Sequence, residues 1–277
     1  MLGTGSAFRA YLCTQEILTM GTFLFDKIIF GPVASRRFGV SLGINLLPIG
    51  HKACTFNCIY CECGWTLSGG ESWQGFPARE EIRKKLEIRL RHMLAEGKAP
   101  DHITFAGNGE PTLHPFFPGI MDDTLLLRDQ YFPGAGITVL SNASLAHKPE
   151  IFRALGKATH NVLKLDAGTE KSFRLINKPL GEVSLERIVS NLMLFKGQLT
   201  VQTMFVKGSI HGHPFDNTVA EETTPWLEYL IRIRPQRVML YSIARDTPLA
   251  GLMPVPGTIL EKIARMVELA GLQPEVF

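Results

Sequence analysis

The chain has 277 residues, of which 45% are hydrophobic and 20% are charged, and its formal net charge at pH 7 is +3. This apolar content, with so small a net charge, excludes an intrinsically disordered chain. The length suffices for one large α/β domain, and the weakly basic balance permits a nucleic-acid partner without indicating one.

Residues 1–25 are expected to form an extension before one barrel domain at residues 26–277. This segment lacks the basic beginning and the clean apolar stretch of a secretory signal, because Glu16 interrupts it. Met20 fits a translation start better than Met1 does, since the sequence after it is typical of the beginning of a domain. The apolar runs are well below the roughly 20 residues that cross a bilayer. The sequence therefore predicts a cytoplasmic protein with no membrane partner.

Short β-rich runs alternate with helical patterns along the rest of the chain. Strands are predicted at residues 41–48, 102–107, 137–142, 162–167, 199–206 and 237–243. Helices are predicted, from apolar residues at helical spacing, at residues 78–96, 184–195 and 257–270. Ser184 is suited to cap the second of these helices, and Gly271 is suited to end the third. On the first helix, basic residues are interleaved with glutamates, which favours a solvated face over a tRNA-binding one.

Alternation of strands and helices indicates parallel strands joined by right-handed crossovers. Six strands are too few for a complete eight-stranded barrel. The pattern leaves two α/β architectures open, an open doubly wound sheet and a partial barrel of six units. In both architectures the chemistry belongs at the carboxyl ends of the strands.

Polar residues gather at those predicted strand ends. The second strand runs into Gly107–Pro111, and the third ends at Asn142. Along the fourth strand, Lys164 and Asp166 share one face because side chains alternate. The sixth strand ends in the segment 241–246. Loops also begin where strands end, so part of this polarity has an ordinary structural cause.

Four of the five cysteines, Cys54, Cys58, Cys61 and Cys63, lie close together in the sequence. The odd count and the lack of a secretion signal favour a metal site over disulfides. Thiolates with the spacing C-x3-C-x2-C fit an iron–sulfur cubane and leave one iron open, as a catalytic centre requires. Cys63 leaves two alternatives open, because four thiolates would close a zinc site or an electron-transfer cluster. The crowded spacing favours the iron–sulfur cluster, because zinc cysteines usually form separated pairs.

The segment Cys54-x3-Cys58-x-Tyr60-Cys61 matches the signature of the radical S-adenosylmethionine (SAM) superfamily. Gly107–Pro111 resembles the glycine-rich segment with which that family holds the SAM amino group, although Asn108 stands where Gly is commoner. Further segments resemble the subgroup related to tRNA wyosine-base-forming enzymes, at residues 31–39, 106–115, 164–168, 202–205 and 241–248. The resemblance spans residues 29–277 and implies a partial (β/α)6 TIM-like barrel. The chain has no second cysteine triad, which argues against family members with auxiliary clusters.

The resemblance implies a radical SAM enzyme, oxidoreductase-like, with a [4Fe–4S] cluster on Cys54, Cys58 and Cys61. Reductive cleavage of SAM would yield a 5′-deoxyadenosyl radical that abstracts hydrogen from an unidentified substrate, an RNA base or a protein. An electron donor such as flavodoxin or ferredoxin is expected. Two alternatives stay open, a non-catalytic iron–sulfur electron carrier and a zinc-stabilised binding module.

The resemblance also implies site residues. Those expected to contact SAM are Tyr60, Gly107, Asn108, Gly109, Glu110, Asn142, Asp166 and Gln202. Those expected to face the substrate are Lys164, Tyr241 and Arg245. Hydrogen bonds within the rim, and a salt bridge for Arg245, are the structural alternatives. Arg36 and Arg37 are expected either to contact the cluster region or the substrate, or to form a surface pair.

Overall fold

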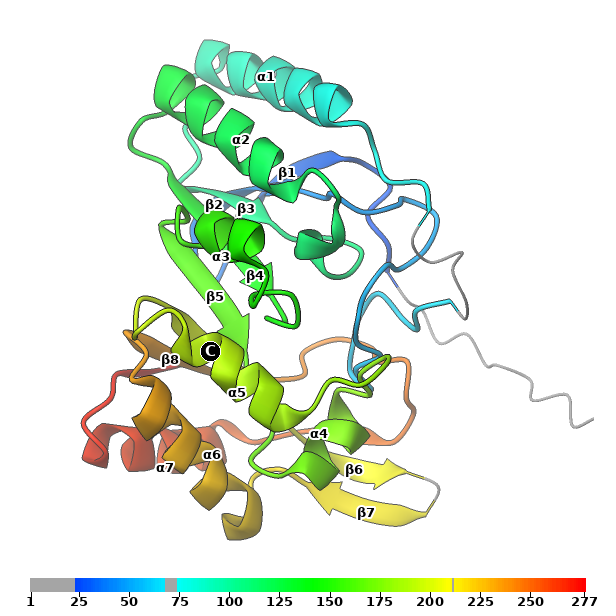
Figure 1. The fold of residues 1–277 in the computed structure, drawn as a ribbon, viewed down its shortest axis with the longest axis vertical. Coiled ribbons are helices and arrows are strands. Elements are labelled where there is room, and N and C mark those ends of the chain that lie inside the picture. The colour runs from blue at the N-terminus through cyan, green and yellow to red at the C-terminus, as the bar shows by residue number, and fades with distance from the viewer. Residues whose placement is uncertain (1–22, 68–73, 211) are drawn as a thin grey trace, which may run out of the picture.

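The computed structural model describes residues 23–67, 74–210 and 212–277 (Figure 1). Most of the predicted extension, with Cys13, therefore lies outside the described residues. Within the described part of the chain, no helix is long and apolar enough to cross a membrane.

All six predicted strands form, and they lie side by side in sequence order as parallel neighbours. They are β2 (Gly39–Ile44), β3 (His102–Phe105), β4 (Gly136–Ser141), β5 (His160–Lys164), β6 (Thr200–Ile210) and β8 (Arg237–Ser242). The sheet is a partial TIM-like barrel with parallel strands and outer helices. Since every crossover is parallel, the carboxyl ends of these strands share one edge of the sheet.

Four further strands extend this sheet. The hairpin strand β1 (Ile29–Ser35) pairs antiparallel with β2, and β10 (Pro274–Val276) pairs parallel with β8 at the far edge. The end of β6 pairs antiparallel with β7 (His213–Asp216) and with β9 (Leu252–Pro254). The long β6 therefore belongs both to the barrel and to a small antiparallel sheet.

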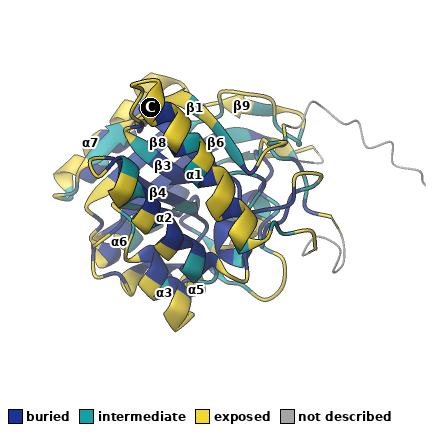
Figure 2. Cartoon of the chain, turned by 90° about the horizontal axis from the view of Figure 1, so that it is seen from above, coloured by how far each residue is buried: buried dark blue, intermediate teal, exposed yellow. Residues whose placement is uncertain are grey.

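The three predicted helices form as α1 (Arg79–Ala95), α5 (Leu185–Met193) and α7 (Gly257–Leu269). Ser184 caps α5 by accepting a hydrogen bond from the Arg187 backbone, and Gly271 follows α7 with a positive φ. The remaining helices are α2 (Phe117–Tyr131), α3 (Pro149–Leu155), α4 (Glu170–Ile176), α6 (Ala220–Ile233) and the short 3-10 helix η2 (Pro111–Leu113). The helices expose one side and bury the other, whereas the six parallel strands of the barrel are largely buried (Figure 2). On the exposed face of α1, Lys85 and Arg91 pair with Glu81 and Glu87.

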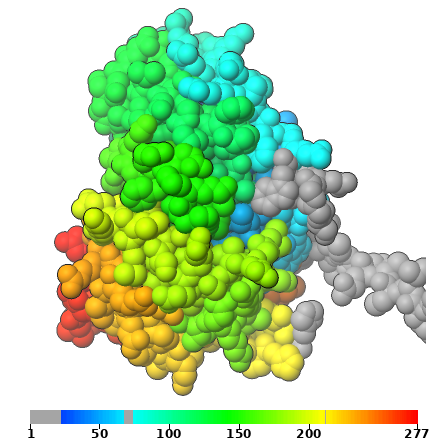
Figure 3. Space-filling view, viewed as in Figure 1, coloured from blue at the N-terminus to red at the C-terminus, as the bar shows by residue number. Residues whose placement is uncertain are grey.

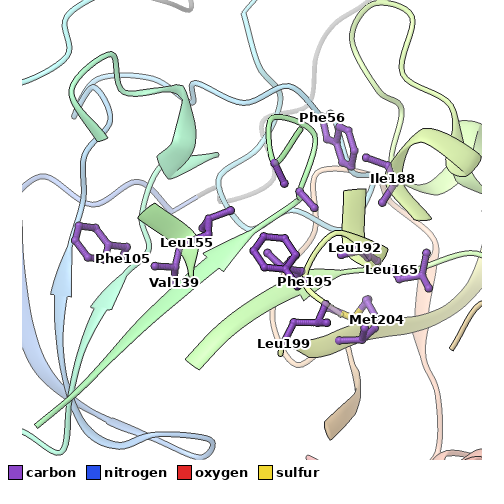
Figure 4. Packing of buried hydrophobic residues seen from close by; sticks show 14 of the residues in the cluster. Phe56, Phe105, Val139, Leu155, Leu165, Ile188, Leu192, Phe195, Leu199 and Met204 are labelled. Carbon is purple, nitrogen blue, oxygen red and sulfur yellow. The ribbon is translucent and has the colours of Figure 1, made fainter. Parts of the chain in front are cut away.

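The main core lies between the sheet and the helices that cover it. Phe105 and Val139 from the strands, Leu155 from α3 and Phe195 after α5 are all buried in it (Figure 4). Each such side chain contributes roughly 1.5–3 kcal/mol when it is fully buried. This layer holds the strands in place and so fixes the positions of the loops at their carboxyl ends.

A second, smaller cluster closes the amino-terminal end of the barrel. Phe38, in the turn between β1 and β2, packs with Val162 of β5 and Met239 of β8. The ring of Phe38 also lies near His102 and His160, which begin β3 and β5. Because one turn meets strands from both halves of the sheet, the sheet curls around a lumen and Phe38 forms its floor.

Candidate active site at the cysteine loop

The cysteine loop, residues 45–66, follows β2 at the carboxyl edge of the sheet. Cys54 and Cys58 are buried in it, and Cys61 and Cys63 are half-buried. The loop is anchored on one side by Ala53, which exchanges backbone hydrogen bonds with Asn108 and Glu110 at 2.9 and 3.0 Å.

On the other side, the loop is tied to the end of α4. The backbone N–H groups of Asn57 and Ile59 donate to the carbonyls of Asn177 and Ile176, at 3.0 and 2.9 Å. Figure 3 shows the blue early segment lying against the yellow-green segment that contains α4. The thiols are therefore held between two parts of the barrel that are distant in sequence.

Gly107 and Gly109 permit the first of these attachments. Both have positive φ, +146° and +136°. A Cβ on Gly107 would lie 2.3 Å from Oδ1 of Asn45, and one on Gly109 would lie 1.9 Å from the Ala53 carbonyl oxygen. The sequence predicted that these glycines let a ligand approach the backbone closely. In the structure the atoms that approach them are those of Asn45 and Ala53.

The sulfur atoms accept hydrogen bonds from amide groups. Asn142 Nδ2 lies 3.6 Å from Cys54 Sγ, and the backbone N–H of Phe56 donates to the same sulfur at 3.4 Å. Asn177 Nδ2 lies 3.5 Å from Cys58 Sγ. Such donors favour sulfur that carries negative charge, which is the form that binds metal.

A buried lysine faces the same sulfurs. Lys52 is only 2% exposed, and its Nζ donates to the Gly64 carbonyl oxygen at 3.0 Å. Burial acts to lower the pKa of Lys52, but the charges of Cys61, Cys54 and Cys58 outweigh burial and raise it. The ammonium group therefore stays charged and offsets the charge that three thiolates would bring together.

The thiols differ in their own surroundings. Burial raises the pKa of the Cys54 thiol to about 12 and raises that of Cys58. A hydrogen bond from the Cys63 thiol lowers the pKa of Cys61 well below its ordinary value. Cys63 also lies 3.4 Å from the carbonyl oxygen of Gly107. In this arrangement Cys63 is a hydrogen-bonding neighbour of Cys61.

The donor set around the loop suits an iron–sulfur cluster better than a single metal ion. Among residues 23–67, 74–210 and 212–277, no three or more His, Cys, Asp or Glu side chains converge on a position for a single metal ion. An iron–sulfur cluster is bound differently, because each thiolate ligates a different iron. Three buried or half-buried thiols, amide donors to sulfur and one buried cation fit that group.

A polar network lies directly beneath the loop, in the barrel lumen. The Tyr60 hydroxyl donates to Asp166, and Lys164 Nζ donates to the Tyr60 hydroxyl at 2.7 Å. Lys164 Nζ is 3.5 Å from Asp166, whose carboxylate also accepts from Asn177 at 2.6 Å and from the Met204 backbone at 2.9 Å. Burial acts to lower the pKa of Lys164, but the charges of Asp166, Tyr241, Cys58 and Cys61 together outweigh burial and raise it.

Glu110 is buried and joins the ends of β3 and β4. One carboxylate oxygen accepts from both the backbone and the hydroxyl of Thr112, at 3.1 and 2.5 Å, and from Ser141 at 2.8 Å. The other accepts from the Asn142 backbone at 2.7 Å. Burial raises the pKa of Glu110. Its second oxygen has the greater remaining capacity to accept a hydrogen bond.

Three of the predicted side chains are engaged elsewhere. The Asn108 amide bonds both backbone groups of Phe25, at 2.8 and 2.9 Å, and the Pro48 carbonyl oxygen at 2.8 Å. Gln202 accepts from Arg37 at 3.0 Å. Arg245 is exposed and pairs with Glu62 at 2.6 Å, which is the salt bridge named as its alternative.

Two contributing residues were missed by sequence reasoning. Lys52 stands two positions before Cys54, and a lysine there carries no signal of burial. Asn177 ends α4 and touches both Cys58 and Asp166, which only the folded chain brings together. Tyr241 is half-buried in the lumen, where it faces Arg37.

Residues 49–223 match the model of the radical SAM superfamily. The chain is 32% identical to the GTPase Obg of Brachyspira hyodysenteriae, over 81% of this chain and 31% of that protein. It is 30% identical to a UPF0026 protein of Methanocaldococcus jannaschii, over 85% of this chain and 70% of the relative. It is 26% identical to the S-adenosyl-L-methionine-dependent tRNA 4-demethylwyosine synthase of Arabidopsis thaliana, over 56% of this chain and 26% of that protein. The chain thus spans less than a third of the first and the last of these relatives.

Solved structures share the fold. The Streptococcus suis protein SuiB gives a TM-score of 0.59 at 15% identity, over 85% of this chain and 49% of SuiB. A radical SAM methyltransferase from Sphaerobacter thermophilus gives a TM-score of 0.58 at 15% identity, over 86% of this chain and 65% of the methyltransferase. Archaeal TYW1 gives a TM-score of 0.53 at 16% identity, over 83% of this chain and 72% of TYW1. These likenesses show a partial TIM-like barrel.

Proposed function

Because the chain belongs to the radical SAM superfamily and resembles the wyosine synthases within it, we propose that Cys54, Cys58 and Cys61 hold a [4Fe–4S] cluster for the cleavage of SAM. The chain is an enzyme of SAM-dependent radical chemistry. One observation carries the proposal: three thiols and the buried ammonium group of Lys52 meet in one loop at the carboxyl edge of the sheet.

When bound, the cluster supplies the electron that breaks a C–S bond of SAM, which gives methionine and a 5′-deoxyadenosyl radical. Cys54, Cys58 and Cys61 would hold the cluster. Lys52 offsets the negative charge of the thiolates. Asn142 and the backbone N–H of Phe56 hold the Cys54 sulfur in place by hydrogen bonds.

The residues around the loop supply the contacts to SAM. Glu110 has acceptor capacity left on its second oxygen, which suits an ammonium group. Asn142 and Asp166 lie close to the cysteine sulfurs, and Tyr60 lies between two of them in sequence. Hydrogen bonds within the protein keep these side chains at fixed positions, so they lose little conformational freedom when SAM binds.

A packed floor suits the radical step, because Phe38, Val162 and Met239 form a buried cluster at the amino-terminal end of the barrel. The substrate enters from the carboxyl edge and gives up a hydrogen atom below the cysteine loop. An RNA base or a protein is the proposed substrate, and a flavodoxin or a ferredoxin in the cytoplasm is the proposed reductant. Residues 26–277 are the proposed catalytic domain.

The test is SAM cleavage by the reconstituted protein. The chain is purified without oxygen, loaded with iron and sulfide, reduced with dithionite and given SAM, and 5′-deoxyadenosine is measured by chromatography. The expected product appears with the wild type and is absent from Cys58→Ala, which loses a ligand. Cys63→Ala is the matched control, since it removes a thiol from the same loop and should keep the cluster.

The two alternatives give other results. An electron carrier with four thiolate ligands would lose its cluster in Cys63→Ala and would show no change of its electron paramagnetic resonance spectrum with SAM. A zinc-stabilised binding module would be colourless after purification without oxygen. Either result would contradict the proposal.

A further inference from the structure

Arg37 reaches into the barrel from below. It lies in the turn between β1 and β2, next to Phe38, which forms the floor of the lumen. Its Nη1 donates to Oε1 of the buried Gln202 on β6 at 3.0 Å. Its Cζ lies 5.2 Å from the ring centroid of Tyr241 on β8. The guanidinium group is therefore held just above the floor by strands on the far side of the barrel.

This cation has no carboxylate partner among the described residues. Its contacts are the neutral Gln202 and the rings of Phe38 and Tyr241. The other two predicted cations of the site are paired, Lys164 with Asp166 at 3.5 Å and Arg245 with a glutamate at 2.6 Å. A half-buried guanidinium group with four N–H donors left over favours an anion, and its planar shape fits two oxygen atoms at once.

The unpaired cation is connected to the cysteine loop through Gln202 and Lys164. Gln202, its partner, is in register with Lys164 across β5 and β6. Lys164 in turn donates to the hydroxyl of Tyr60, which lies in the cysteine loop between Cys58 and Cys61. Arg37 therefore contacts the same face of the sheet as Lys164, which in turn contacts the cysteine loop.

We propose that Arg37, with Gln202 and Tyr241 around it, binds an anionic oxygen group of the substrate, a carboxylate or a phosphate, at the floor of the barrel. The statement that the anion belongs to a substrate rests on the proposed function, whereas the anion site itself does not. It assigns the recognition of charge to Arg37, whose guanidinium lies inside the barrel, and not to the exposed and paired Arg245.

Calorimetric titration of the cluster-loaded protein tests the site. The probes are acetate and methyl phosphate, each added with and without saturating SAM. The wild type is expected to bind at least one of them, and Arg37→Gln is expected to bind it at least tenfold more weakly. Binding of acetate alone would identify a carboxylate, and binding of methyl phosphate alone would identify a phosphate. Arg36→Gln is the matched control, because this neighbour is exposed, and it should bind as the wild type does.

A second variant keeps the test decisive if Arg37→Gln does not fold. Gln202→Glu has nearly the same shape and sets a carboxylate beside Arg37, so the internal ion pair should abolish binding of the probes. Unchanged binding in Arg37→Gln or in Gln202→Glu would overturn the proposal, as would no binding by the wild type. Binding that SAM abolishes would also overturn it, because Arg37 would then hold the SAM carboxylate. Failure of the wild type to form 5′-deoxyadenosine would contradict the proposed function alone.

Discussion

Lys52 donates a hydrogen bond from its buried ammonium group to the carbonyl oxygen of Gly64 at 3.0 Å, across the cysteine loop. The bond fixes a positive charge behind three thiols. A cluster gains negative charge when it is reduced, and a fixed cation stabilises the reduced form more than the oxidised form.

The variant Lys52→Met should therefore make the bound cluster harder to reduce. The shift of its reduction potential is expected to be on the order of −60 mV, which is tenfold in the equilibrium constant for one electron. A redox titration followed by electron paramagnetic resonance measures it. Lys85→Met, on the exposed face of α1, is the control and should leave the potential unchanged. An equal potential in all three proteins would remove this role from Lys52.

The ion pair of Lys164 and Asp166 should matter to the stability of the chain without its cluster. The side chain of Asp166 is 0% exposed and that of Lys164 is 16% exposed. Asp166→Asn leaves the lysine charge without its partner and should lower the free energy of unfolding by about 3 kcal/mol. Asp122→Asn removes the partner of Lys157 from an exposed pair and should cost less than about 1 kcal/mol. Denaturant titration measures the free energy of unfolding of both variants. Equal losses in the two variants would show that the buried pair stabilises the chain no more than the exposed pair does.

Gly109 should tolerate no side chain. Its φ is +136°, and a Cβ there would lie 1.9 Å from the Ala53 carbonyl oxygen. Gly109→Ala is expected to separate the cysteine loop from the end of β3, with a loss of about 3 kcal/mol and a lower iron content after reconstitution. Gly50→Ala is the control in the same loop, since nothing lies within 4 Å of the added atom. Full iron loading of Gly109→Ala would show that this attachment is dispensable.

The histidines under the floor should make stability depend on pH. Burial lowers the pKa of His102, although Asp101 acts in the opposite direction. Burial also lowers the pKa of His160, helped by His102 and Arg237 and opposed by Glu275. Both pKa values are below the ordinary 6.5, so the unfolded chain takes up protons more readily. The stabilisation is present above about pH 6.5 and is lost as the pH falls through the folded-state values.

Urea titrations of the chain without its cluster, at about pH 7.5 and about pH 5.5, measure this effect. The midpoint should fall at the lower pH, and it should fall less in His160→Gln. His147→Gln, at an exposed position, should behave as the wild type does. A fall of the same size in all three proteins would place the pH dependence elsewhere in the molecule.

The strands were predictable because their signal is local. Each of the six shows a short β-rich run before a polar loop, and all six form. The ends were less accurate, since β2 stops at Ile44 and β6 continues to Ile210. The extra length of β6 is stabilised by β7 and β9, which contribute their hydrogen bonds from later in the chain. The edge strands β1, β7, β9 and β10 were not predicted at all.

The site was predictable only where one motif carried it. The three cysteines lie in one short segment, so they can be recognised as a candidate metal site without knowledge of the fold. Asn108 also belongs to a motif, but its amide is used by Phe25 and Pro48, which a motif does not show. Lys52 and Asn177 act through burial and through contacts across the barrel, which one sequence does not encode in any local pattern.

The attachment of Asn177 to Cys58 joins residues 119 positions apart. The cysteine loop is therefore synthesised long before the residue that bonds one of its sulfurs, because chains are made and begin to fold from the amino terminus. Until α4 has been synthesised and has docked, the cysteine loop lacks the contacts that Asn177 and Ile176 make with it. A cluster bound as proposed would therefore meet its complete set of sulfur contacts only in a chain that has folded past α4.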